Sequence, residues 1–135
     1  MPNFFVAYIA TAAVFLAADF LWLSYASSAF YRPKLGELLS DNPNLTIAAV
    51  FYLVYAIGIV VFAVLPATAA RSASMAIGLG ALLGLVAYGT YDITNLATIR
   101  GWPASVSVVD LAWGVLVTSL AAASGYLALK MVQGV

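Results

Sequence analysis

The sequence contains no cysteine and no histidine. Without cysteine there can be no disulfide, no thiolate nucleophile and no sulfur-ligated metal site. Without histidine the chain lacks the commonest general base and the usual haem and zinc ligand. We therefore predict neither a metal site nor a bound cofactor. Acid–base chemistry, if there is any, would have to use carboxyl groups.

Charged residues are also scarce. They make up 7% of the 135 residues, with five basic and five acidic side chains and a formal net charge of zero. A soluble domain carries about 25% charged residues, so this chain could not cover its own surface in water. So few lysines and arginines also argue against nucleic-acid binding. Because 65% of the residues are hydrophobic, the composition predicts an integral membrane protein.

Four long apolar stretches support that prediction. They cover approximately residues 3–26, 45–66, 75–99 and 104–131. Each reaches the length of about 20 residues that a helix needs to cross the bilayer, and none alternates as the strands of a barrel would. We predict one transmembrane domain over residues 1–135, an all-α four-helix bundle with both termini on the same side. The first stretch contains Asp19 and follows no basic segment, so we interpret it as a membrane helix and not as a signal peptide.

The connections between the spans differ in length. The first, Ser27–Asn44, is the longest, and Pro33 within it suits the first turn of a short helix with leucines on one face. This pattern predicts a short interfacial segment between helices one and two, with a simple ordered loop as the alternative. The third, Arg100–Pro103, is so short that the helices it joins must be antiparallel neighbours. Basic residues occur on both sides, so the membrane orientation stays undecided.

Three of the five acidic residues fall inside the predicted spans: Asp19, Asp92 and Asp110. In a four-span chain, the ends of the first and third helices and the start of the fourth lie on one side of the membrane. Asp19 and Asp92 each lie seven residues before the end of a span, and Asp110 lies seven residues after Pro103. At 1.5 Å per residue, all three should lie roughly 10 Å below the same membrane surface. We therefore predict that they form one cluster.

Each aspartate continues a stripe of residues at helical spacing. The stripes of the third and fourth helices contain glycines that allow close helix packing, namely Gly80, Gly84 and Gly114. The aspartates should therefore point into the bundle. Two of them begin the same short motif, D-x-x-W, in Asp19–Trp22 and Asp110–Trp113.

Carboxyl groups at this depth are costly. An ionised carboxylate in the bilayer centre costs about 2.5–3.5 kcal/mol on the insertion scale, and neighbouring carboxylates repel each other, so we expect at least one to be protonated. Such residues are functional by default, although satisfied polar networks also hold helix bundles together. The candidate ligand-binding or proton-relay residues are Asp19, Asp92, Asp110, Asn95, Tyr88, Tyr91, Trp22 and Trp113.

The run YGTYDITNLATIRGWP at residues 88–103, followed by Asp110-Leu-Ala-Trp113-Gly114, resembles a bacterial membrane-protein family catalogued as domain of unknown function 2177. The motif that starts at Asp19 and the run Tyr31–Gly36 also fit its pattern. The resemblance covers essentially the whole chain. It implies a small, multi-pass, four-helix protein of the bacterial inner membrane, and it implies no particular activity.

Three functions are compatible with these observations. The first is binding or transport of a small or lipidic ligand, linked to a cation or a proton, in a carboxylate and aromatic pocket. The second is a membrane enzyme that acts on a lipid-like substrate by carboxylate acid–base chemistry. The third is a structural accessory subunit of a membrane complex. Membrane lipid is the expected partner in every case, and a homodimer or a larger membrane complex remains an alternative to a monomer.

Overall fold

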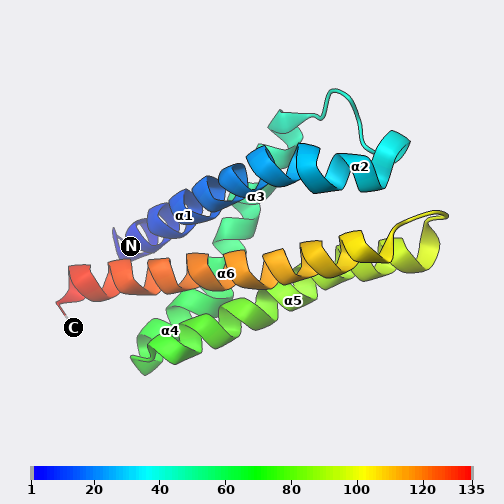
Figure 1. Ribbon diagram of the computed structural model, residues 1–135. Helices are drawn as coiled ribbons and strands as arrows, with labels where there is room; N and C mark the ends of the chain where they lie inside the picture. Colours follow the sequence, from blue (N-terminus) through cyan, green and yellow to red (C-terminus); the bar gives the residue numbers. More distant parts are fainter. Residues whose placement is uncertain (1, 135) are drawn as a thin grey trace.

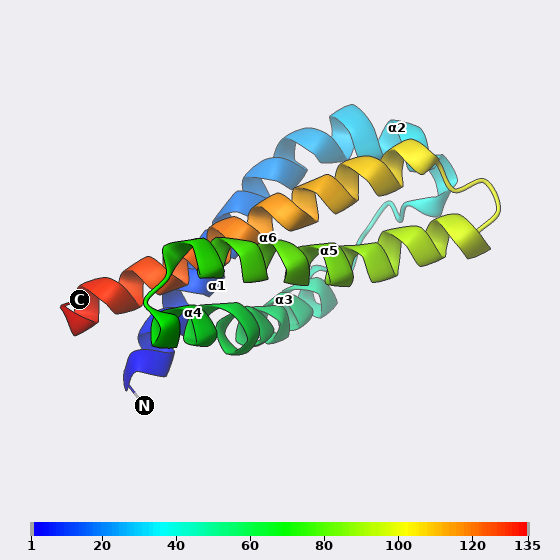
Figure 2. The same cartoon turned by 90° about the horizontal axis from the view of Figure 1, so that it is seen from below.

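A computed structural model describes residues 2–134, and throughout this range the chain is helical or in turns, with no strand. Four continuous helices are long and apolar enough to cross a membrane: Asn3–Leu38, Leu45–Ala70, Ala73–Thr98 and Ala104–Gln133. The all-helical fold with four membrane-spanning helices, predicted from composition, is therefore confirmed. Both termini lie at the same end of the bundle (Figures 1 and 2). We call this the terminal end, and the other end the loop end.

The apolar stretch predicts that the first helix ends near Ala26, but the helix continues beyond this residue. Helix α1 (Pro2–Ala26) runs directly into a π-helical turn η1 (Ser27–Tyr31), then α2 (Arg32–Leu35) and a 3₁₀ turn η2 (Gly36–Leu38). The expected interfacial segment is thus mostly a continuation of the first helix, in line with α1 in Figure 1. A loop at residues 39–44 then leads back to the second helix.

The second helix is also longer than its apolar stretch. It comprises α3 (Leu45–Ile59), a π-helical turn η3 (Val60–Val64) and α4 (Leu65–Ala70). A proline inside a helix has no N–H to donate, and its ring clashes with the preceding turn. Here a π-helical turn comes just before each proline, η1 before Pro33 and η3 before Pro66. Because a π turn interrupts the regular ladder of hydrogen bonds, we attribute the continuation of both helices to this arrangement.

Helix α6 (Ala104–Gln133) is the centre of the bundle. It pairs closely with the antiparallel α5 (Ala73–Thr98) on one side and packs on α1 on the other. The turn between α5 and α6 contains Gly101 at a φ of +79°, a backbone conformation that favours glycine. The hairpin of α5 and α6 that the short connection predicts is therefore present.

Helix α3 crosses the other helices steeply (Figure 1). This second helix contacts α5 mainly through η3 and α4, near the terminal end, whereas α3 itself packs on α1. The largest apolar core accordingly lies in the terminal half of the bundle, around Phe15, Val60 and Val117. Towards the loop end, α3 and α5 diverge, and this divergence provides the space for the site.

The outer surface of the bundle is apolar, as a bilayer requires. Large hydrophobic side chains are exposed on every long helix, for example Phe20, Ile47, Phe62, Leu82 and Leu116. In water such a surface would aggregate, whereas in lipid it is the expected exterior. The structure is therefore that of a membrane protein, as composition predicts.

Candidate functional site

A cavity of about 670 Å³ lies in the loop half of the bundle. Its lining comes from all four long helices and from the loop after η2, and most of it is aromatic or aliphatic. The charged residues in the lining are three aspartates and no lysine or arginine. The lining includes Asp19, Trp22, Tyr31, Leu35, Leu39, Ala48, Phe51, Tyr52, Tyr55, Ala87, Tyr88, Thr90, Tyr91, Asp92, Trp102, Asp110 and Trp113.

The structure brings nearly all of the predicted site residues to this one cavity. Asp19, Asp92, Asp110, Tyr88, Tyr91, Trp22 and Trp113 all line it. Asn95 does not. It lies one turn beyond Tyr91 on α5, outside the lining. The three aspartates therefore line one cavity, as the offsets from the predicted span ends suggested, although the first helix itself continues beyond Ala26.

The two D-x-x-W motifs interact with each other across the contact between α1 and α6. The indoles of Trp22 and Trp113 are stacked, with ring centroids 4.9 Å apart and planes 14° from parallel. Trp113 Nε1 donates a hydrogen bond of 3.0 Å to Asp19 Oδ1 on the other helix. Because α1 and α6 are antiparallel, the two motifs run in opposite directions. The tryptophan of each motif therefore lies on the side of the aspartate of the other motif.

Trp22 is linked to Asp110 through the hydroxyl group of a tyrosine. Trp22 Nε1 donates to the Tyr31 hydroxyl at 3.2 Å, and that hydroxyl donates to Asp110 Oδ1 at 2.8 Å. Asp19 and Asp110 therefore each accept a hydrogen bond from an aromatic side chain. Tyr31 belongs to η1, in the stretch that the sequence assigns to a connection, so sequence reasoning missed it. Helical spacing gave no signal for it, because a regular α-helix would place a residue nine positions after Trp22 on the opposite face, and the π-helical turn η1 changes that register.

Asp92 differs from the other two aspartates. Its side chain is completely buried, and among the described residues no donor reaches either of its carboxyl oxygens. Its titratable neighbour is Asp110, whose carboxyl group lines the same cavity. Two carboxyl groups can bond to each other only when one of them holds a proton, because an ionised carboxylate only accepts. The cavity thus contains a carboxyl group whose acceptors are not satisfied by donors from the protein.

Helix α3 supplies a tyrosine wall opposite the carboxyl groups. The Tyr52 hydroxyl lies beside Asp19, and the Tyr55 hydroxyl shares a 2.8 Å hydrogen bond with Thr118 on α6. Tyr55 and Tyr88 also meet edge to face, with ring centroids 6.2 Å apart.

Trp102, in the turn before α6, also lines the cavity. Its indole N–H donates to Ser107 Oγ at 3.0 Å, and Ser107 donates to the backbone carbonyl of Asp92 at 2.6 Å. Its ring meets Tyr91 edge to face at 5.9 Å. This chain of contacts ties the turn before α6 to the α5 residue that carries the unsatisfied carboxyl.

The glycines named from the sequence lie at the contact between α5 and α6. A methyl group on Gly84 would meet the backbone of Gly114, and one on Gly114 would overlap the ring of Tyr88. A methyl group on Gly80 would come within 2.9 Å of the Cβ of Ala122. Close packing of these helices is what sets Tyr88 and Asp92 against α6.

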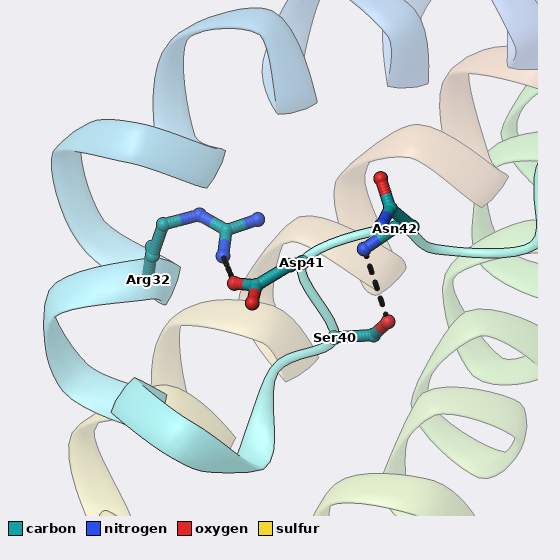
Figure 3. Close-up of polar contacts among 4 residues, drawn as sticks. All are labelled: Arg32, Ser40, Asp41 and Asn42. Carbon is teal, nitrogen blue, oxygen red and sulfur yellow. Dashed lines mark hydrogen bonds and ion pairs between the residues drawn. The ribbon is translucent and has the colours of Figure 1, made fainter.

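Basic residues do not neutralise the carboxyl cluster. Arg32 on α2 forms an ion pair with Asp41 in the following loop, with 3.7 Å between Nη1 and Oδ1 (Figure 3). In the same loop, the backbone N–H of Asn42 donates to Ser40 Oγ. The Arg32–Asp41 pair is the single ion pair among residues 2–134. In the same range, no group of three acidic side chains is arranged to hold a metal ion.

Comparison with known proteins gives one match. A family model described as "Predicted membrane protein (DUF2177)" matches residues 4–127. No curated protein and no solved structure matches the chain.

Proposed function

The chain belongs to the DUF2177 family of membrane proteins, and we propose that it binds a small amphipathic ligand in the cavity, in the inner membrane of a bacterium. The ligand would bring hydrogen-bond donors or positive charge to the aspartates and an apolar body to the aromatic wall. The observation that carries this proposal is Asp92, a fully buried carboxyl group that no donor of the described chain reaches.

A buried polar group without a partner costs about 1–3 kcal/mol. The cost is reduced when Asp92 and Asp110 share a proton, but such a pair still leaves acceptor oxygens unused. A primary ammonium group has three donors and no acceptor, so it matches this set of oxygens. Because the lining contains no lysine or arginine, a cationic ligand meets attraction and no repulsion there. A phosphate or carboxylate head group would instead be repelled by the aspartates.

The remaining lining favours an apolar body behind that head. The stacked Trp22–Trp113 pair and the tyrosines of α3 present ring faces and edges to the cavity. Ligand sites are commonly cavities of about 300–1,000 Å³ with mostly apolar walls and few polar groups, and this cavity has that size and character. Aromatic faces also attract cations, which adds to the preference for an ammonium group.

Octylammonium is a suitable probe, because it joins an ammonium group to a short chain and dissolves in water. Its binding to the protein in lipid nanodiscs can be followed by the fluorescence of the stacked tryptophans. We expect Asp92→Asn and Asp110→Asn to weaken binding by more than about 10-fold, equivalent to about 1.4 kcal/mol. The matched control is Glu37→Gln, which makes the same change on an exposed carboxylate outside the cavity. Equal affinity in all four proteins would refute the proposal.

A further inference from the structure

The cavity reaches the surface of the bundle on the side between α3 and α5. Phe51 on α3 and Tyr91 on α5 both line the cavity, yet their side chains are 61% and 56% exposed. Ala48 and Thr90, also in the lining, lie beside them on the same two helices. Phe51, Tyr91 and Thr90 line the cavity and are exposed, so they lie at its mouth, and the half-buried Ala48 borders the same lateral opening.

The edges of this opening are well defined. Towards the terminal end it is closed by the contact between Tyr55 and Tyr88, and the hydrogen bond from Tyr55 to Thr118 holds that edge against α6. On the α5 side, Tyr91 is supported by Trp102. Between these contacts α3 and α5 diverge, because their packing is concentrated at η3 and α4.

The depth of the opening places it against lipid. Tyr91 lies seven residues before Thr98, the last residue of α5, or about 10 Å from the helix end. A 26-residue helix is about 39 Å long, so in a hydrocarbon core of about 30 Å each end extends about 5 Å beyond it. The opening therefore lies about 5 Å inside the hydrocarbon region, at the level where acyl chains begin.

The surroundings of the opening suit acyl chains. The exposed neighbours along the two helices are apolar, with Val50 and Val54 on α3 and Val86 and Ile93 on α5. The hydroxyl of Thr90 donates to the Val86 carbonyl at 2.6 Å, so it does not present a free donor to lipid.

At the loop end the cavity is lined by apolar side chains. Leu35 of α2 and Leu39 of the following loop form this part of the lining. The Arg32–Asp41 ion pair ties the loop to α2 (Figure 3). A charged head that entered from water would have to pass these leucines, whereas a molecule dissolved in the bilayer meets an opening at the depth of its own chain.

We propose that the ligand is a membrane-dissolved long-chain primary amine that enters sideways between α3 and α5. Its ammonium group would reach the half-buried Asp110 directly and the fully buried Asp92 after a movement of the side chains that cover it. Its chain would extend past Phe51 and Tyr91 into the bilayer. This inference rests on the proposed function, since it names the class of ligand for the same cavity. It adds two claims: that the chain remains in the membrane, and that the route is lateral.

The route can be tested with two adjacent alanines on α3. Ala48 lines the cavity at the mouth, whereas Ala49 is exposed and outside the lining. We expect Ala48→Phe to slow the association of octadecylamine, delivered in phosphatidylcholine vesicles to protein in vesicles of the same lipid, by at least about 10-fold. This threshold corresponds to about 1.4 kcal/mol in the barrier. Ala49→Phe adds the same bulk to the lipid-facing side and should associate as the wild type does.

A second measurement locates the chain. Octadecylamine with a photoreactive diazirine at mid-chain should label Phe51 or Tyr91, and excess octylammonium should prevent the labelling. Equal association rates for Ala48→Phe and Ala49→Phe, or labelling confined to other surfaces, would overturn the lateral route. If wild-type protein binds octylammonium but not octadecylamine, the long-chain inference fails alone. If it binds neither, the proposed function fails with it.

Discussion

Replacement of Gly84 by alanine tests whether close packing of α5 on α6 stabilises the bundle. An added Cβ would lie 2.9 Å from the carbonyl carbon of Gly114 and 3.0 Å from the Cα of Val115. Both are backbone atoms of α6, so no side-chain rotation can relieve the contact. Gly78 is the matched control on the same helix, because a Cβ there meets no atom within 4 Å.

The magnitude follows from these distances. Ordinary contacts begin near 3.4 Å, and the carbonyl oxygen of Gly114 lies closer to the added Cβ than either carbon. The two helices must therefore separate locally by more than about 0.5 Å, which forfeits at least about a quarter of the dispersion energy of each affected contact. Overpacking of this kind costs about 1–3 kcal/mol. In an open position, alanine instead stabilises a helix by about 0.5–1 kcal/mol relative to glycine. Because this gain applies equally to both variants, it cancels in their comparison, and we expect Gly84→Ala to be less stable than Gly78→Ala by about 1–3 kcal/mol.

The assay is unfolding in mixed micelles with a rising fraction of dodecyl sulfate, followed by far-ultraviolet circular dichroism. The two variants have the same composition, so their difference isolates the contact with Gly114. Because α5 carries Tyr88 and Asp92, loosening of this interface should also weaken octylammonium binding in Gly84→Ala and not in Gly78→Ala. Equal stability of the two variants would refute the argument that close approach of the backbones holds α5 on α6.

Two further predictions use the same unfolding assay. Asp92→Leu removes a buried carboxyl group that has no donor, so it should raise the free energy of unfolding by about 1–3 kcal/mol while abolishing octylammonium binding; a destabilised variant would instead support a structural role for the cluster. Tyr31→Phe removes a hydroxyl that joins Trp22 to Asp110 and should cost about 1–3 kcal/mol, since two hydrogen bonds are lost. Tyr55→Phe removes a bond between two hydroxyls and should cost only about 0.5–1.5 kcal/mol, so equal losses would contradict this ranking.

The membrane fold and the clustering of the aspartates could be predicted because both follow from simple geometry. A run of apolar residues long enough to cross the bilayer has one stable backbone conformation there. Once four spans alternate in direction, the distance of Asp19, Asp92 and Asp110 from the helix ends determines their depth. Glycines on the aspartate stripes indicated that the aspartates point into the bundle, since small residues mark where α5 and α6 approach each other.

The parts that could not be predicted depend on where helices continue. Pro33 was predicted to start a separate short helix and Pro66 to end the second span, but a π-helical turn precedes each of them and the helix continues. That continuation carries Tyr31 over the cavity and gives Asp110 its donor. The divergence of α3 from α5 depends on the packing of η3, which no period or spacing in the sequence reveals. Asn95 was placed on the correct stripe, but one turn too far from the cavity.

The three carboxyl groups differ in whether they accept a hydrogen bond from the protein, and this difference is the strongest argument for a ligand. If the cluster served only to hold the helices together, each aspartate should be satisfied by a donor from another helix, because an unsatisfied member makes a polar network worse than an apolar core. Asp19 and Asp110 fit that expectation through Trp113 and Tyr31. Asp92 does not, although it is the most deeply buried of the three. A membrane bundle that needed only stability would be better served by leucine at that position, so the carboxyl group of Asp92 is best explained by a donor that comes from outside the chain.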